Sequence, residues 1–300
     1  MTPEEAYGVC ERIARQHYEN FPVASLLLPA AMRPHIAAIY AFARAADDFA
    51  DEGDRAPAER LALLDDWGRR LRASAGAVAA GHPNPEPRIP NPESDAVFLA
   101  LGHTIRARAL PVSLFEDLLS AFRQDVVTAR YATWADVMDY CRRSANPVGR
   151  LVLRVAGRAD GRLDAASDAV CTALQLTNFW QDLDRDWRKG RLYVPRDDRE
   201  RFGAREPDLD ARVMSPAWRE VMSAMAARTH RLFDEGRMVC DALEGRLRYE
   251  LRLTWLGGMR ILRRLERARF DVFAARPALG ASDVPALLWS AVSWSRPKAA

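Results

Sequence analysis

The chain of 300 residues contains few cysteines, and no two of them are close in the sequence. They are Cys10, Cys141, Cys171 and Cys240, and none belongs to a CxxC pair. Zinc sites and disulfide frameworks need closely spaced or paired cysteines. We therefore expect isolated thiols in a reducing compartment and a fold that needs neither a structural zinc ion nor a disulfide.

Long apolar runs and a large net charge are also lacking. No stretch approaches the ~20 apolar residues of a membrane-spanning helix, and the N-terminal sequence MTPEEAYGVCERIARQ is acidic and amphipathic, unlike a signal peptide. The net charge of +3 gives no reason to expect a nucleic-acid partner. We predict a cytoplasmic protein. Contact of the apolar stretch 284–294 with the inner-membrane surface stays open as an alternative.

Alternating β-type runs bounded by Asn-Gly or Asp-Gly are absent, whereas helical periodicity is frequent. Apolar residues recur at i, i+3, i+4 and i+7 in segments 59–73, 112–126 and 212–236. Thr133 followed by Asp136 is typical of a helix start. The sequence therefore predicts an all-α fold.

Two segments interrupt this helical pattern. Five prolines fall within residues 82–95, which predicts an exposed loop. A polar stretch at 188–210 interrupts the helices again. Because the helices on both sides of the first loop have similar character, we predict one all-α domain over residues 1–300.

Residues 40–54, YAFARAADDFADEGD, hold the first acidic motif. At about 100° per residue, one helix face carries Tyr40, Arg44, Asp47 and Asp51, with Asp48 about 100° from Asp47. Like charges at i and i+4 destabilise a helix, so something should offset them. A divalent cation with oxygen ligands would do so. The alternative is a solvated acidic helix end capped by Gly53.

Residues 175–195, QLTNFWQDLDRDWRKGRLYVP, hold the second acidic motif. On a helix, one stripe within about 80° carries Gln175, Asn178, Asp182 and Asp186. A cationic cluster follows, formed by Arg185, Arg188, Lys189 and Arg191. In one interpretation these cations only complement the helix dipole and pair with Asp184 or Asp186. In the other, metal ligands and phosphate-binding cations lie side by side.

Two acidic stripes in one all-α chain are more specific than either alone, and they favour the metal interpretation. Mg²⁺ suits carboxylates beside Arg and Lys because it keeps waters and takes phosphate oxygens as further ligands. The predicted ligands are Asp47, Asp48, Asp51, Asn178, Asp182 and Asp186.

These motifs resemble those of the squalene/phytoene synthases, a family of head-to-head prenyl transferases. DDFAD (47–51) is similar to the first aspartate-rich motif, NFWQDLDRD (178–186) to the NxxxDxxxD motif, and GRLYVP (190–195) to GRxYLP. The resemblance extends from about His17 to Glu266. It implies an isoprenoid synthase-type helical bundle around a central cavity.

Three local patterns point to one branch of the family: HYENFPVASLLLP (17–29), YCRRSANPVGRLVL (140–153) and FWQD (179–182). The condensing relatives carry LRD or IRD where this chain has WQD. The favoured branch acts on an already condensed intermediate. The resemblance thus implies a carbon–oxygen lyase that converts presqualene diphosphate and water into hydroxysqualene and diphosphate in hopanoid biosynthesis.

The resemblance also implies roles for individual residues. Two or three Mg²⁺ ions, or Mn²⁺ instead, would be held by the six predicted ligands, and water capture needs no NADPH. Phosphate and substrate binding fall to Arg44, Gln175, Asn178, Lys189, Arg191, Tyr193 and Phe21. Tyr40 and Tyr131 would face the carbocation, with Phe21 and Tyr140 as further candidates. Asn146, or a carbonyl freed by Pro147, would hold the attacking water.

The sequence leaves other functions open. A presqualene diphosphate, phytoene or dehydrosqualene synthase would condense two prenyl diphosphates. A non-catalytic family member would have lost the aspartates, and a terpene cyclase would lack the GRLYVP segment. The expected partners are a prenyl diphosphate substrate and, by functional coupling, a presqualene diphosphate synthase and a hydroxysqualene dehydroxylase.

Overall fold

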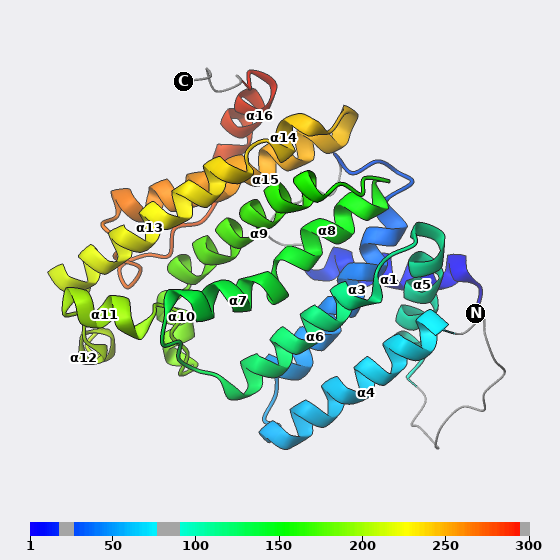
Figure 1. Ribbon diagram of the computed structural model, residues 1–300, viewed down its shortest axis with the longest axis horizontal. Coiled ribbons are helices and arrows are strands. Elements are labelled where there is room, and N and C mark those ends of the chain that lie inside the picture. Colours follow the sequence, from blue (N-terminus) through cyan, green and yellow to red (C-terminus); the bar gives the residue numbers. More distant parts are fainter. Residues whose placement is uncertain (18–26, 77–90, 295–300) are drawn as a thin grey trace. The chain divides into compact units, whose positions relative to one another are not determined.

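The computed structural model describes residues 1–17, 27–76 and 91–294 and shows them as helices joined by loops (Figure 1). Over these ranges there is no β-strand, and an isolated bridge pairs Arg130 with Leu192. The predicted all-α fold is confirmed. None of the described helices is both long enough and apolar enough to cross a membrane.

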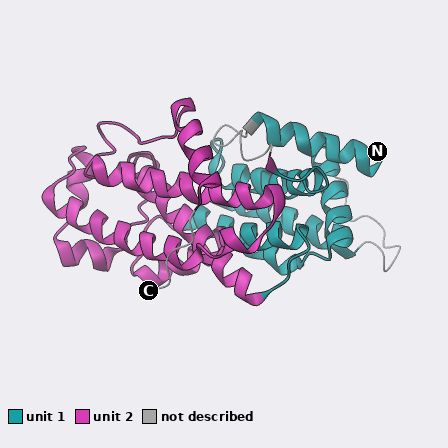
Figure 2. Cartoon of the chain, turned by 90° about the horizontal axis from the view of Figure 1, so that it is seen from above, with its two compact units in different colours: residues 1–22, 28–127, 147–160 teal, residues 23–27, 128–146, 161–300 magenta. Residues whose placement is uncertain are grey.

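The chain divides into two compact units (Figure 2). Unit 1 comprises residues 1–22, 28–127 and 147–160, and unit 2 comprises residues 23–27, 128–146 and 161–300. The sequence places the first acidic motif in unit 1 and the second in unit 2. That the whole chain forms a single domain stays a prediction.

Unit 1 is built around the alanine-rich helix α3, which packs against α1, α4, α5 and α6. Small alanines let these helices approach closely, while Phe42 stacks on Trp67 and meets Phe98 and Phe115 edge-on. The helices are α1 (Pro3–His17), α3 (Arg33–Asp51), α4 (Pro57–Gly76), α5 (Pro92–Arg108), α6 (Val112–Val127) and α8 (Asn146–Val155).

Unit 2 is organised around α9, which packs against α7, α13, α14 and α15. Gly236 on α13 makes close packing possible, because a Cβ there would lie 2.6 Å from the Ala166 carbonyl oxygen. The helices are α7 (Trp134–Ser144), α9 (Gly161–Gln181), α10 (Leu183–Arg188), α11 (Arg196–Phe202), α12 (Glu206–Asp210), α13 (Pro216–Gly236), α14 (Val239–Ala242), α15 (Gly245–Arg267), the short 3₁₀ turn η1 (Ala281–Asp283) and α16 (Val284–Val292).

Helix boundaries follow local capping chemistry. Thr133 and Asp136 form the predicted start of α7: the Thr133 hydroxyl accepts from the Asp136 N–H at 3.2 Å, and the Asp136 carboxylate accepts from the Thr133 N–H at 2.8 Å. The helical pattern also breaks where Pro147 predicts it, between α7 and α8.

Two predicted loops contain more helix than expected. The loop prediction for 82–95 is wrong at its end, because α5 begins at Pro92 after Asn91, whose Oδ1 accepts from the Glu93 and Ser94 N–H groups. Residues 77–90 lie outside the described residues. The polar stretch 188–210 holds the short helices α11 and α12 rather than only irregular chain.

Glu250 on α15 is a buried acid with a testable consequence. Glu250 is 8% exposed, and its Oε2 accepts no hydrogen bond from the described part of the chain. Burial raises the pKa of Glu250 to about 8. Between the ordinary value of 4.5 and about 8, the folded chain therefore keeps a proton that the unfolded chain releases. Stability must fall as pH rises through this window, by up to ~1.4 kcal/mol per pH unit.

We expect Glu250→Gln to match the wild type in stability at pH 4 and to exceed it by a margin that grows between pH 5 and pH 8, by up to ~1.4 kcal/mol per pH unit, because the amide cannot ionise. Urea unfolding at pH 4, 5, 6, 7 and 8 measures the difference. Parallel stability curves for the two proteins would contradict the assignment of a raised pKa to Glu250.

Candidate active site

The first acidic motif surrounds one arginine on α3. Arg44 Nη2 lies 2.6 Å from Asp48 Oδ1 and 2.8 Å from Glu52 Oε1, and its Nη1 lies 3.6 Å from Asp47 Oδ2. Burial lowers the pKa of Arg44, but the carboxylates of Asp48, Asp47 and Glu52 raise it more, so the net shift is upward. The guanidinium stays charged and offsets the repulsion between neighbouring carboxylates.

A second arginine fixes the end of α3. Arg60 on α4 donates from Nη1 to the Ala50 carbonyl and from Nη2 to the Gly53 carbonyl, both at 2.6 Å. A cation at this position complements the negative end of the helix dipole. The acidic residues of the last turn are thereby held on a well-anchored helix end. Sequence reasoning missed Arg60 because no motif marks it.

Tyr40 lies one turn before Arg44 on α3 and is partly buried. Burial raises the pKa of Tyr40, Arg44 lowers it, and Asp47 and Asp48 raise it further. The phenol is therefore neutral at physiological pH. Unit 1 thus carries Tyr40, Arg44, Asp47, Asp48 and Asp51 on one helix.

The second acidic motif crosses the junction between α9 and α10. Asp182 is the residue between these helices, yet the i to i+4 hydrogen bonds continue through it: its N–H donates to the Asn178 carbonyl, and the Asp186 N–H donates to the Asp182 carbonyl, both at 2.8 Å. Asn178 Nδ2 also donates to Asp182 Oδ2 at 3.2 Å. The structure therefore brings Asn178 and Asp182 into contact, with Asp186 one turn further along. Gln175 lies one turn before Asn178 on α9 and is partly exposed.

Arg276 contacts this motif from the segment after α15. Its Nε lies 2.5 Å from Asp182 Oδ1 and its Nη2 lies 3.0 Å from Asp182 Oδ2, while Arg185 Nη1 is 3.7 Å from Asp182 Oδ1. Such a two-point arginine–carboxylate pair fixes orientation as well as charge. Arg276 was missed from the sequence because it lies 94 residues away from Asp182 and beyond the motifs.

The chain then turns sharply behind α10. Lys189 is the C-terminal cap of α10, Gly190 adopts a φ of +78°, and the Arg191 N–H donates to the Asp186 carbonyl at 2.8 Å. The next residue, Leu192, donates its N–H to the Ala129 carbonyl at 2.9 Å. This extended pairing of 190–196 with 129–132 brings together residues that are distant in sequence.

The result is a buried aromatic cluster beside the second acidic motif, made of Tyr131, Tyr140, Phe179 and Tyr193. The Phe179 and Tyr193 rings stack at 3.7 Å with an interplanar angle of 4°. Tyr131 lies 5.5 Å from Tyr193 and 5.7 Å from Tyr140, measured between ring centroids. The cluster therefore contains the predicted Tyr131 and Tyr193, and it adds Phe179. Phe21 lies outside the described residues.

Asn146 begins α8 and is 8% exposed. Thr172 on α9 donates its hydroxyl to Asn146 Oδ1 at 2.9 Å. Because Oδ1 accepts from Thr172, the Nδ2 end of the amide is the donor available to a water or ligand.

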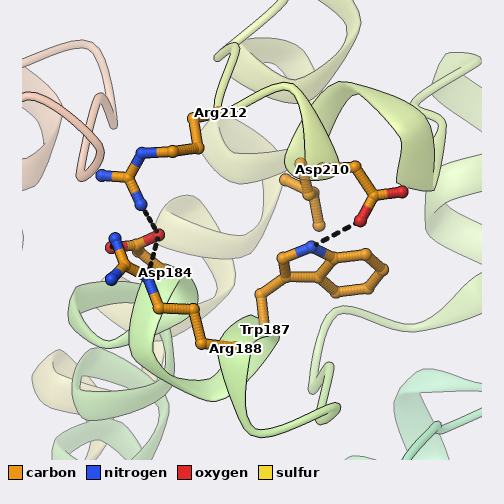
Figure 3. A pocket seen from close by; sticks show the side chains of 6 residues that line it. Asp184, Trp187, Arg188, Asp210 and Arg212 are labelled. Atoms are coloured by element: carbon orange, nitrogen blue, oxygen red, sulfur yellow. Dashed lines mark hydrogen bonds and ion pairs between the residues drawn. The ribbon is translucent and has the colours of Figure 1, made fainter.

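A pocket of about 560 Å³ lies beside α10, lined by Asp184, Trp187, Arg188, Leu209, Asp210 and Arg212 (Figure 3). Arg212 Nη1 lies 2.5 Å and Arg188 Nη2 3.1 Å from Asp184 oxygens. Asp184 projects about 200° around the helix from Asp182. Arg188 therefore pairs with Asp184, as one of the two interpretations of the cationic cluster expected. This cluster of Asp184, Arg188 and Arg212 is separate from the stripe that carries Asn178 and Asp182.

The donor set can be tested against Mg²⁺. Within the described residues, no three His, Cys, Asp or Glu side chains are gathered closely enough to hold a metal ion as they lie. Mg²⁺ in phosphate sites is usually held by one or two carboxylates, with water and phosphate oxygens as the other ligands. The oxygen-only sets Asp47–Asp48–Asp51 and Asn178–Asp182–Asp186 fit that chemistry. Which of these residues bind metal stays a prediction.

An all-α fold with two acidic helix motifs, arginine partners and a buried aromatic cluster defines a recognisable class. The chain belongs to the squalene/phytoene synthase family, whose sequence profile matches residues 14–283.

Individual relatives are informative within this family. The chain is 41% identical to the hydroxysqualene synthase of Zymomonas mobilis, covering 71% of this chain and 67% of that protein. It is 30% identical to the 15-cis-phytoene synthase of Synechocystis, covering 98% and 86%. The crystal structure of squalene synthase HpnC from Alicyclobacillus acidocaldarius matches with a TM-score of 0.79 at 40% identity, covering 89% and 95%.

We expect Asp47→Asn and Asp182→Asn each to keep the helical fold and to lose ~10²-fold or more of the Mg²⁺-dependent kcat/KM, because each removes a carboxylate from a predicted metal ligand set. Circular dichroism and steady-state kinetics measure the two properties.

Asp184→Asn is the matched control, since it removes the same charge from the opposite face of α10. It should cost about 1 kcal/mol of stability through the pairs with Arg188 and Arg212 and leave kcat/KM near the wild-type value. Full activity of Asp182→Asn would remove this carboxylate from the catalytic machinery.

Proposed function

We propose that this protein is a hydroxysqualene synthase, which converts presqualene diphosphate and water into hydroxysqualene and diphosphate. The observation that supports the proposal is that polar and aromatic side chains adjoin each other on α9. Asn178, which contacts Asp182, is followed by Phe179, which stacks on Tyr193. A diphosphate leaving group and the carbocation it leaves behind need these two surfaces side by side. The identity of 41% to a hydroxysqualene synthase agrees with this assignment.

Loss of diphosphate is the first step. The ligands proposed for Mg²⁺ are Asp47, Asp48, Asp51, Asn178, Asp182 and Asp186. When bound, Mg²⁺ neutralises the negative charge that develops on the leaving diphosphate. Arg44, Lys189 and Arg191 would add charge-assisted hydrogen bonds to phosphate oxygens, and Gln175 would bind substrate beside Asn178.

Protection of the carbocation is the second requirement. Breaking the carbon–oxygen bond leaves a cyclopropylcarbinyl cation, which rearranges with opening of the ring. Aromatic faces attract positive charge. Tyr131 and Tyr140 of the buried cluster are proposed to face the cation, with the stacked rings of Phe179 and Tyr193 packed beside them. Tyr40 offers a neutral phenol on α3. Phe21 is proposed as a substrate-binding residue from the sequence alone, because it lies outside the described residues.

Capture by water ends the reaction: the water oxygen bonds to the cationic carbon, and one proton leaves. No reductant takes part, so NADPH is not required. Asn146 is proposed to hold this water through its Nδ2 group, because Thr172 occupies Oδ1. Its low exposure would keep other water away.

The setting of the enzyme is also part of the proposal. On α16, Leu287 and Ala291 pack against Leu253, whereas Trp289 is 73% and Val292 65% exposed. Exposed Trp and aliphatic side chains suit a membrane interface. We infer a cytoplasmic enzyme with peripheral contact to the inner membrane. It would be functionally coupled to a presqualene diphosphate synthase and a hydroxysqualene dehydroxylase, which supply its substrate and consume its product.

We expect the purified chain with Mg²⁺ and without NADPH to form hydroxysqualene from presqualene diphosphate and to leave farnesyl diphosphate unchanged. Chromatography of the extracted products and diphosphate release measure both reactions. Turnover of farnesyl diphosphate would instead support a condensing synthase of the same family.

We expect Asn146→Ala to lower the ratio of alcohol to hydrocarbon products, because the cation then lacks its positioned nucleophile. Thr172→Val, which leaves the Asn146 side chain but removes its partner, should lower the ratio less. An unchanged ratio in Asn146→Ala would exclude Asn146 from water capture.

A further inference from the structure

A segment without α-helix follows α15, ends in the 3₁₀ turn η1 and crosses the second acidic motif; we call its residues 271–283 the strap. Arg276 of the strap pairs with Asp182, and the next strap residue, Pro277, accepts a hydrogen bond at its carbonyl from Gln181 Nε2. Gln181, the last residue of α9, and Asp182, which follows it, thus bind two consecutive residues of the strap.

Other contacts anchor the strap at residues that do not touch Asp182. Arg212 Nη2 donates to the Phe273 carbonyl at 3.2 Å, and Arg264 donates to the Ala278 carbonyl. Arg264 also pairs at 2.5 Å with Asp283, which is 2% exposed. These anchors fix the two sides of the strap, but they do not touch Arg276.

Gln181 is the side chain that can set the position of the Arg276 guanidinium. Pro277 has a restricted φ and no N–H, so its carbonyl is the only backbone group of this residue that can form a hydrogen bond with a neighbour. The Gln181 amide holds this carbonyl one residue away from Arg276. It thereby limits the directions from which the guanidinium reaches the Asp182 carboxylate.

This pairing has a consequence for cation binding. Arg276 covers both oxygens of Asp182 at 2.5 and 3.0 Å, and the Asp182 side chain is 13% exposed. A divalent cation would need the same oxygens. At low exposure the two cations also repel each other more strongly than they would in bulk water.

We propose that Gln181 is a positioning residue that holds Arg276 on Asp182, and that Arg276 thereby lowers the affinity of the second acidic motif for divalent cations. The inference rests on the proposed function only where that proposal makes Asp182 a metal ligand. It names Gln181, in the WQD sequence, as the residue that joins the strap to the acidic motif.

The test measures Mn²⁺ binding to the full chain without substrate, by electron paramagnetic resonance of free Mn²⁺. We expect Arg276→Met to tighten binding about fivefold or more, which is the lower end of typical coupling between sites. Gln181→Met, which keeps the side-chain length but removes the donor, should shift binding in the same direction by less. The double variant should equal Arg276→Met, because Gln181 acts through Arg276.

Arg264→Gln is the matched control, since it releases another anchor of the strap without touching Asp182. It should leave Mn²⁺ binding within about twofold of the wild type. Equal effects of Arg264→Gln and Gln181→Met would overturn the proposal, because general loosening of the strap would then explain both. Additive effects of Gln181→Met and Arg276→Met would also overturn it, and so would unchanged binding in Asp182→Asn.

The experiment is independent of the reaction assigned to the enzyme. If the predicted Mn²⁺ pattern is found but presqualene diphosphate is not turned over, the proposed function fails and the positioning role of Gln181 stands. If hydroxysqualene is formed but Mn²⁺ binding of Gln181→Met equals that of the wild type, the positioning role fails alone.

Discussion

Carboxylates crowded on helix surfaces repel each other, and the arginines that neutralise them hold the surrounding structure in place. In the first acidic motif Arg44 contacts three carboxylates, and Arg60 binds the carbonyls at the end of the same helix. In the second, Arg276 covers Asp182. These arginines also hold the backbone in place, because their contacts have a fixed geometry. The same contacts therefore balance the charge and position the helix ends.

The second constraint is the burial of α9. Helices α7, α13, α14 and α15 pack against it, and Gly236 lets α13 approach so closely that a methyl group would collide with the α9 backbone. Trp180 donates its indole N–H to Thr229 at 2.9 Å, which locks the register of the two helices. A helix held in this way presents Asn178 and Phe179 at fixed positions, and those two residues join the polar and aromatic parts of the proposed site.

Local chemistry explains which structural predictions succeeded. The capping box at Thr133 and Asp136 needs only residues within one turn, so it could be read from the chain. The start of α5 at Asn91 was also encoded locally, but the surrounding prolines suggested a longer loop. Arg276 and Phe179 could not be found in this way. Arg276 reaches Asp182 only because the strap folds back across the end of α9. The place of Phe179 in the aromatic cluster follows only from its stacking on Tyr193.

The sequence by itself determined the all-α class, the two acidic motifs and the family, because helical periodicity, capping and motif spacing all act over a few residues. The tertiary structure alone decided which cation neutralises Asp182, and that Tyr131, Tyr140, Phe179 and Tyr193 form one cluster. It also decided that Gln181 holds the strap. The physical reason is that ion pairs and ring contacts depend on distance in space, and chain segments far apart in sequence meet only after the helices have packed.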